Sequence, residues 1–325
     1  MEEINITEGL INMNDSVSAK ETDWVQSCED AAQNDEFFKT FRSSKAFQRV
    51  IEGTPRVGGI WNLKRLLKDK NFLKTLPLLQ KSDIIGLPLN TIQFKFNEKS
   101  YNLSPTTIRY ANNASNCVSF FGKDIFLGNT DIFEIGAGYG GEFKVFNDYS
   151  VALFNKKLDT KWHIYDLPSS IAVIKKFLSH FNYLPNFNEL KKDSTEKNSN
   201  SLVISNGAFS EMTGSLLDEY FEAVISPAKY GYFISNFEIQ SEPFGGWNTK
   251  KFIMRLKKCG KNDVAILPAE KYLSYFDQQA GSKLIVFGHT ALKDDKSKIK
   301  DIILIKFIEF LDSCEDFFKN KFLKN

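Results

Sequence analysis

A glycine-rich turn preceded by a carboxylate is the segment of this sequence best suited to chemistry. The apolar run 132–135 leads into a turn that contains Gly136, Gly138 and Gly141. Glycine lets a backbone turn tightly and approach a ligand, and the helix expected after the turn presents free N–H groups. Such a turn can bind a phosphate, a carboxylate or another polar ligand.

The charge beside this turn indicates which ligand it binds. Gly136, Gly138 and Gly141 also satisfy the spacing of a dinucleotide site, with Asp166 further along, so a nicotinamide-dependent oxidoreductase is one reading. However, Glu134 lies two residues before the first glycine, and its charge repels a pyrophosphate but attracts a cation. The turn also follows about 130 residues of mostly helical sequence instead of opening the chain. We therefore favour a cationic ligand.

The segment 133–140 resembles the first motif of class I methyltransferases, which bind the positively charged cofactor S-adenosylmethionine. Asp166 matches the acidic residue that accepts hydrogen bonds from both ribose hydroxyls, which suits a carboxylate with its two oxygens. The alternatives are a surface carboxylate for Glu134 and a helix cap for Asp166. The cofactor contacts that the resemblance implies are Glu134, Gly136, Ala137, Gly138, Asp166, Leu167 and Asn206.

A narrower resemblance concerns the acceptor of the methyl group. The segments 165–168 and 205–212 are similar to those of the family of sugar O-methyltransferases, and so are 104–110 and 120–122. The similarity runs from about residue 83 to residue 289. It implies methyl transfer to a hydroxyl of a sugar, whether free, nucleotide-linked or part of a glycan. One departure is Gly207, where a bulky or aromatic residue is expected, and its loss changes the pocket wall.

A sugar hydroxyl is a weak nucleophile at neutral pH, so a general base should accelerate its methylation by roughly 10²–10⁴-fold. In a parallel sheet the ligands bind at the carboxyl ends of the strands, which selects residues in the loops that follow them. Glu211 is our first choice as base or acceptor-orienting group, and its alternative role is to stabilise a helix N-terminus. The other candidates in these loops are Asn206, Asn236, Glu238, Trp247, Glu270, Tyr272 and Asp277.

Three further residues are candidates for binding the substrate. Arg109 would contact an anion, either the cofactor carboxylate or a substrate phosphate, unless it is a solvated residue on a helix face. Trp247 would stack on a sugar ring or simply pack, and Glu238 lies in the same loop.

His289 has the chemistry of a base, but the last strand of the methyltransferase fold is antiparallel, so its far end points away from the cofactor. We expect His163, inside a strand, to be structural.

Strands separated by helices of ten to fifteen residues predict an α/β protein with a Rossmann-like, mainly parallel sheet. The resemblance adds that the last strand is antiparallel. Helices are expected over 105–121, 168–183, 215–225 and 249–258, and from the glycine turn to about residue 155. The expected strands of this sheet are 132–135, 161–165, 187–190, 201–205, 232–235, 263–267 and 284–288.

The chain divides into four predicted parts. Residues 1–20 are a flexible terminus, and 21–125 form a mainly helical substrate or cap region, with one or two strands over 91–103 and helix breaks at the glycines near residues 53 and 58. Residues 126–290 form the domain that binds S-adenosylmethionine. Residues 291–325 contain an amphipathic helix that packs on this domain or on a second subunit, which offers a route to a homo-oligomer.

The composition excludes several classes of protein. The 325 residues are 42% hydrophobic and include 30 phenylalanines, which is too apolar for a disordered chain. The net charge of +2 removes the case for a nucleic-acid binder, and no apolar run is long enough to span a membrane. The scattered cysteines and histidines predict a cytoplasmic protein without a metal site. A non-catalytic binding protein with a methyltransferase fold is a further alternative.

Overall fold

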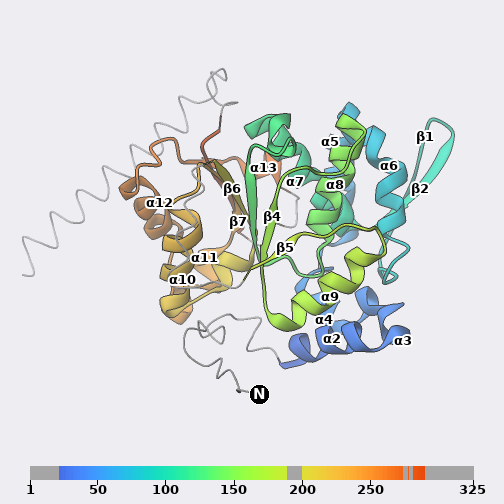
Figure 1. Ribbon diagram of the computed structural model, residues 1–325, viewed down its shortest axis with the longest axis horizontal. Helices are drawn as coiled ribbons and strands as arrows, with labels where there is room; N and C mark the ends of the chain where they lie inside the picture. The colour runs from blue at the N-terminus through green and yellow to red at the C-terminus, as the bar shows by residue number, and fades with distance from the viewer. Residues whose placement is uncertain (1–21, 189–199, 274–276, 278–280, 290–325) are drawn as a thin grey trace, which may run out of the picture.

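The computed structural model describes residues 22–188, 200–273, 277 and 281–289 (Figure 1). The predictions for residues 1–20 and 291–325 lie outside this range. A seven-stranded sheet forms the centre, in the order β5-β4-β3-β6-β7-β9-β8. Its strands are β3 (Asp131–Ile135), β4 (Trp162–Tyr165), β5 (Asn186–Phe187), β6 (Ser201–Asn206), β7 (Tyr230–Ser235), β8 (Ala265–Leu267) and β9 (Lys283–Phe287).

The direction of the strands identifies the fold. β3 runs parallel to β4 and β6, β4 to β5, and β6 to β7, whereas β9 is antiparallel to both β7 and β8. A parallel sheet whose last strand is inserted antiparallel is the Rossmann-like class I methyltransferase architecture, so the predicted fold class is confirmed. The carboxyl ends of β3, β4, β6 and β7 meet at one edge, where such sheets bind their ligands.

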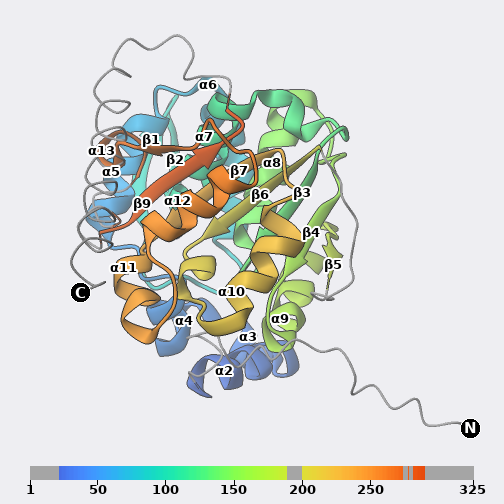
Figure 2. The ribbon, with the colours of Figure 1, turned by 90° about the vertical axis from the view of Figure 1, so that its left-hand side faces the viewer.

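Two apolar cores lie on opposite faces of this sheet, because successive side chains of a strand point to opposite sides. Ile132 and Tyr232 belong to one core and Phe133 and Phe233 to the other. In Figure 2, α10 and α12 lie in front of the sheet and α7 and α8 behind it. The covering helices are α7 (Pro105–Phe121), α8 (Gly141–Phe154) and α9 (Pro168–Ser179) on one face, and α10 (Gly214–Tyr220) and α12 (Thr249–Lys258) on the other.

An N-terminal layer of helices packs on the outside of the first group. α2 lies against α9, whereas α5 and α6 lie against α7 and α8, as Figure 1 shows at the right and below the sheet. Among the described residues, no helix has both the length and the apolar character needed to cross a membrane. The elements of this layer are α2 (Thr22–Gln33), α3 (Asp35–Phe38), η2 (Phe41–Ser43), α4 (Lys45–Val50), α5 (Arg56–Leu66), α6 (Lys70–Ser82) and the hairpin of β1 (Ile92–Phe96) and β2 (Lys99–Leu103).

Two features of this layer differ from the sequence prediction. The expected helix break at Gly58-Gly59 is wrong, because α5 runs through both glycines. A Cβ atom on Gly59 would lie 2.6 Å from the Ile92 side chain and 2.8 Å from Cβ of Pro105. The glycine therefore serves close packing of α5 against its neighbours instead of a turn. α6 was not predicted, and its side chains Phe72 and Leu76 are buried in the core.

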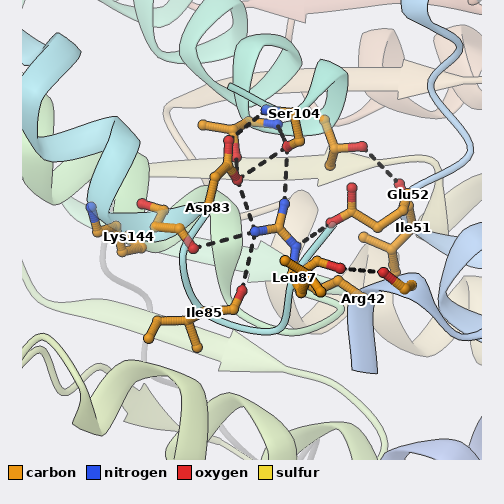
Figure 3. A network of polar contacts seen from close by, with 12 residues as sticks. Arg42, Ile51, Glu52, Asp83, Ile85, Leu87, Ser104 and Lys144 are labelled. Carbon is orange, nitrogen blue, oxygen red and sulfur yellow. Dashed lines mark hydrogen bonds and ion pairs between the residues drawn. The ribbon is translucent and has the colours of Figure 1, made fainter. Parts of the chain in front are cut away.

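A fully buried arginine joins the N-terminal layer to the sheet domain (Figure 3). The Arg42 guanidinium donates to Oε1 of Glu52 at 2.5 Å, to Oδ1 of Asp83 at 2.8 Å and to Oγ of Ser104 at 2.9 Å. Its Cζ also lies 4.9 Å from the ring centroid of Tyr139, a residue of the glycine turn. The network thus fixes η2, the connector after α6 and the start of α7 next to that turn.

Candidate functional site

The glycine turn between β3 and α8 is packed so closely against its neighbours that two of its positions have no room for a side chain. Gly136 has φ 78°, and a Cβ atom placed on it would lie 2.1 Å from Cβ of Ala208. Gly138 has φ 61°, and a Cβ atom there would lie 2.7 Å from Cδ1 of Ile51. Positive φ and close contact both require glycine. The chain passes so near to its neighbours that a side chain at either position would displace them.

Asp166 follows β4 and binds the backbone of the same turn. Its Oδ2 accepts hydrogen bonds from the N–H groups of Ala137 at 2.7 Å and Gly138 at 3.0 Å. Its Oδ1 accepts from the N–H group of Leu167 at 2.7 Å, next to the start of α9. Burial raises the pKa of Asp166, although these backbone hydrogen bonds act to lower it. Asp166 therefore holds the turn and the helix start together through three backbone N–H groups, and the Ser170 side chain is a further partner.

A cavity of about 260 Å³ lies at the carboxyl edge of the sheet. It brings together residues from β3, the glycine turn, the loops after β6 and β7, and the N-terminal layer. Leu167 and Asp166 border the turn but do not line this cavity. The predicted site residues that do line it are Arg109, Glu134, Gly136, Ala137, Gly138, Asn206, Glu211, Asn236 and Asp277.

Two buried carboxylates face the cavity. The Glu134 side chain is 1% exposed, and its Oε2 accepts a hydrogen bond from Nε1 of Trp162 at 2.8 Å. Glu142 is 2% exposed, and its Oε1 accepts from Nδ2 of Asn113 at 2.9 Å. Burial raises the pKa of both side chains, and the negative charge of Glu142 raises the pKa of Glu134 further. This wall of the cavity thus favours a positively charged ligand.

Sequence reasoning missed Glu142. It lies in the first turn of α8, where a carboxylate is ordinarily explained by the helix dipole alone. In the fold its Oε2 also accepts a 3.5 Å hydrogen bond from Nδ2 of Asn206, and its partner Asn113 accepts one from the Tyr232 hydroxyl at 3.1 Å. The sequence does contain a signal for this residue: Glu142 directly follows a glycine turn that Glu134 already precedes, so a carboxylate stands on each side of the turn.

Arg109, on α7, lines the same cavity and lies one helical turn before Asn113, the partner of Glu142. Its Nη2 donates to the carbonyl oxygen of Ile51 at 3.4 Å, and its Cζ lies 5.6 Å from the ring centroid of Tyr110. Its Nε is buried and has no hydrogen-bond partner among the described residues. Burial acts to lower the pKa of Arg109, but nearby negative charges, Asp277 first, raise it overall. The solvated-helix alternative for this residue does not fit a guanidinium in a cavity wall.

Glu211 ends the short helix η4 (Ala208–Glu211), which follows β6 and precedes α10. Gly207, before η4, has φ 97°, a conformation that favours glycine. This backbone explains why the expected bulky residue is absent. A Cβ atom on Gly207 would lie 3.6 Å from Oε1 of Glu211, so the two residues are neighbours in the cavity wall. Asn236, after β7, lines the same cavity and accepts a hydrogen bond from the Ser210 hydroxyl at 2.9 Å.

Two predicted substrate residues are not brought to the cavity. Oε1 of Glu238, on α11 (Phe237–Gln240), accepts from Nζ of Lys283 at 2.9 Å and from the N–H group of Thr249 at 3.2 Å. Trp247 is 2% exposed and belongs to the second core. Its indole therefore has no open face for a sugar ring, which favours the packing alternative. The aromatic residues around it are Phe209, Phe221 and Phe252.

The histidines lie away from the cavity wall. Phe287, near the end of β9, pairs with Gly231 near the start of β7, so His289 follows at the edge opposite to the cavity. Nδ1 of His163, in β4, lies 2.8 Å from Nδ2 of Asn188, in keeping with a structural role. Within the described part of the chain, no group of three or more His, Cys, Asp and Glu side chains could hold a metal ion.

Comparison with solved structures finds similar folds at low identity. A SAM dependent methyltransferase from Aquifex aeolicus is 13% identical, with 55% of this chain and 97% of that chain covered and a TM-score of 0.34. A Pyrococcus abyssi tRNA (uracil-54, C5)-methyltransferase, solved with S-adenosyl-L-homocysteine, is 11% identical over 62% and 45% of the two chains, with a TM-score of 0.34. EvdMO1 is 12% identical over 61% and 44%, with a TM-score of 0.37.

The chain thus spans less than half the length of two of these proteins. No family model and no curated protein sequence matches it. One fold hosts many activities, so the function of this chain depends on the residues of its site.

Proposed function

We propose that this protein is an S-adenosylmethionine-dependent O-methyltransferase that acts on a hydroxyl of a sugar. The observation that carries the proposal is a glycine turn whose cavity is lined by two buried carboxylates, Glu134 and Glu142. Opposite charges attract strongly where water is scarce, so this wall suits the sulfonium and ammonium groups of the cofactor. The same wall would repel the pyrophosphate of a dinucleotide, which argues against the oxidoreductase alternative.

Each proposed cofactor residue contacts a different part of S-adenosylmethionine. Gly136, Ala137 and Gly138 supply the close backbone, and Glu134 faces the positive end. Asp166, beside Leu167, takes the ribose hydroxyls with the lone pairs that its hydrogen bonds to the turn leave over, because a carboxylate has about four acceptor sites. Asn206 orients Glu142 and contacts the cofactor or the acceptor. When bound, the cofactor supplies an electrophilic methyl group.

The proposed acceptor side consists of Glu211 and Arg109. Glu211 takes the proton from the sugar hydroxyl, and Arg109 binds an anionic group. The sugar itself rests on the sequence resemblance over 165–168 and 205–212. The helical region 21–125 and the sheet domain 126–290 both contribute residues that line the cavity. We keep a cytoplasmic location and a homo-oligomer through the terminal helices as parts of this proposal.

Calorimetric titration of the purified protein with S-adenosylhomocysteine and with NAD tests the cofactor. We expect the first to bind and the second not to, and Asp166→Ala to abolish binding. Binding of NAD alone would overturn the proposal. Transfer of label from methyl-tritiated S-adenosylmethionine to a panel of free and nucleotide-linked sugars then tests the reaction. Cofactor binding without transfer to any member would favour a non-catalytic binding protein.

A further inference from the structure

We infer that the sugar acceptor carries a phosphate group, and that Arg49 and Arg109 bind this group at the mouth of the cavity. The inference rests on the proposed function for the reaction, but it adds the charge of the substrate and a second arginine that the sequence did not single out. Both arginines line the cavity, Arg49 from α4 and Arg109 from α7.

The first observation is the incomplete hydrogen bonding of Arg109. A guanidinium offers five N–H donors, yet Nη2 makes one long hydrogen bond and Nε makes none with the described residues, although it is buried. A buried donor without a partner is costly, so such a group calls for an explanation such as a ligand. A phosphate oxygen is an acceptor that suits this fork.

The second observation is that Arg49 forms an exposed ion pair with Asp23. Its side chain is 43% exposed, and its Nη1 and Nη2 donate to Oδ2 and Oδ1 of Asp23 at 2.9 and 2.6 Å. This is the bidentate geometry with which arginine also binds phosphate. An exposed ion pair contributes little to stability, so a doubly charged phosphate can replace the Asp23 carboxylate at little cost.

The two arginines are connected through the end of α4. Arg109 donates to the carbonyl oxygen of Ile51, two residues after Arg49, so both guanidinia flank the end of α4. The buried carboxylates Glu134 and Glu142 belong to β3 and α8, and Glu142 also acts electrostatically on Arg109. A cationic methyl donor near the carboxylates and an anionic acceptor near the arginines would therefore share one cavity, where their opposite charges attract.

The charges next to the arginines favour a phosphate over a weaker anion. Asp277 lines the same cavity and acts electrostatically on Arg109, and Asp23 pairs with Arg49. Glu142 and Glu52 also act electrostatically on Arg109, so a ligand must compete with several carboxylates. A phosphate monoester, with a charge between about −1.5 and −2 at neutral pH, competes better than a single carboxylate.

Titrations in the presence of saturating S-adenosylhomocysteine test the inference with matched probes, glucose 1-phosphate against glucose and UDP against uridine. We expect at least one phosphorylated probe to bind roughly tenfold or more tightly than its neutral counterpart, which corresponds to about 1.4 kcal/mol. Arg49→Gln should weaken that probe at least fivefold and leave S-adenosylhomocysteine affinity within twofold. Asp23→Asn should tighten it two- to fivefold, because one carboxylate that competes for Arg49 is removed.

Arg56→Gln is the control, since Arg56 is exposed and does not line the cavity. It should leave both affinities unchanged. Equal binding of phosphorylated and neutral probes in both pairs would overturn the inference. So would an Arg109→Gln variant that loses S-adenosylhomocysteine but keeps the phosphorylated probe, because the anion bound by Arg109 would then be the cofactor carboxylate. A wild-type protein that does not bind S-adenosylhomocysteine would instead contradict the proposed function.

Discussion

Glu134 is an ionisable side chain at a buried position where a neutral side chain would make the folded protein more stable. Its burial, together with the charges of Glu142 and Asp166, raises its pKa well above the ordinary value of 4.5. The folded protein therefore binds a proton at this side chain more tightly than the unfolded chain does. The resulting stability is complete below pH 4.5 and is lost as the pH rises through the folded pKa. Binding of a cationic ligand would explain why the chain has a carboxylate here although it destabilises the folded protein at neutral pH.

Glu134→Gln should raise the melting temperature relative to the wild type, by an amount that grows as the pH increases above about 5. The amide oxygen can still accept the hydrogen bond from Trp162, so the packing is kept. The same change should weaken S-adenosylhomocysteine binding tenfold or more. Thermal unfolding between pH 5 and pH 8, combined with calorimetry, measures both effects. A variant as stable and as tight-binding as the wild type at pH 8 would contradict this account.

Glu211→Gln should lower kcat for sugar methylation by roughly 10²–10⁴-fold, because the amide cannot take a proton. S-adenosylhomocysteine affinity should change little, which separates the chemical step from cofactor binding. Glu29→Gln, at an exposed position of α2, is the matched control. If the Glu211 variant keeps its rate within about threefold, another group is the base.

At the scale of elements, the glycine turn combines two separable constraints. Gly136→Ala introduces a Cβ atom 2.1 Å from Ala208 at φ 78°, whereas Gly260→Ala has a similar φ of 88° and nothing within 4 Å. The second variant measures backbone strain alone. We expect Gly136→Ala to cost about 1–3 kcal/mol more free energy of unfolding in urea, as overpacking does, and to lose S-adenosylhomocysteine binding. An equal loss of unfolding free energy in the two variants would show that Ala208 moves aside at no energetic cost.

The Arg42 network makes the N-terminal layer part of the sheet domain. Arg42→Met leaves Glu52 and Asp83 as buried charges without their cation, so it should cost about 3–5 kcal/mol of unfolding free energy. Lys39→Met removes an exposed ion pair with Glu36 and should cost at most about 1 kcal/mol. Urea unfolding followed by circular dichroism compares the two. Similar costs would mean that the layer does not depend on this network.

Elements with local signals were predictable, and those set by tertiary contacts were not. The Ser104 cap, Pro105 and Gly122 define α7 from Pro105 to Phe121 as the sequence predicted, because the cap and the glycine stop act locally. Gly59 misled the prediction, since a glycine that serves helix packing looks like one that ends a helix. Glu142 escaped it because its partners come from α7 and β6. Trp247 could equally bind or pack until its neighbours were known.

At the scale of the whole molecule, the phenylalanines serve two cores and not one. Phe177 and Phe146 lie in the core beneath α8 and α9, whereas Phe209 and Phe252 lie in the core beneath α12. The sheet separates the two, and the cavity lies at its carboxyl edge. A ligand that joins the N-terminal layer to the sheet should therefore stabilise the folded protein against global unfolding.

S-adenosylhomocysteine at about 100 times its Kd should add about 2.7 kcal/mol to the free energy of unfolding. For a chain of 325 residues, with an unfolding entropy of about 2.1 cal/mol/K per residue, the gain corresponds to a rise in melting temperature of roughly 4 °C. NAD at the same concentration should give no rise, and Asp166→Asn should abolish the effect of S-adenosylhomocysteine. Differential scanning calorimetry measures the shift. A rise with NAD but not with S-adenosylhomocysteine would contradict the proposed cofactor.

The hydrogen bond from the Trp162 indole to Glu134 gives the protein a natural optical reporter. The emission of an indole depends on the charge beside it, and this indole is buried next to a carboxylate of the cavity wall. Trp247 lies in the other core, away from this carboxylate. Cofactor entry, or a change in the protonation of Glu134, would thus be visible as a change in intrinsic fluorescence without any attached dye.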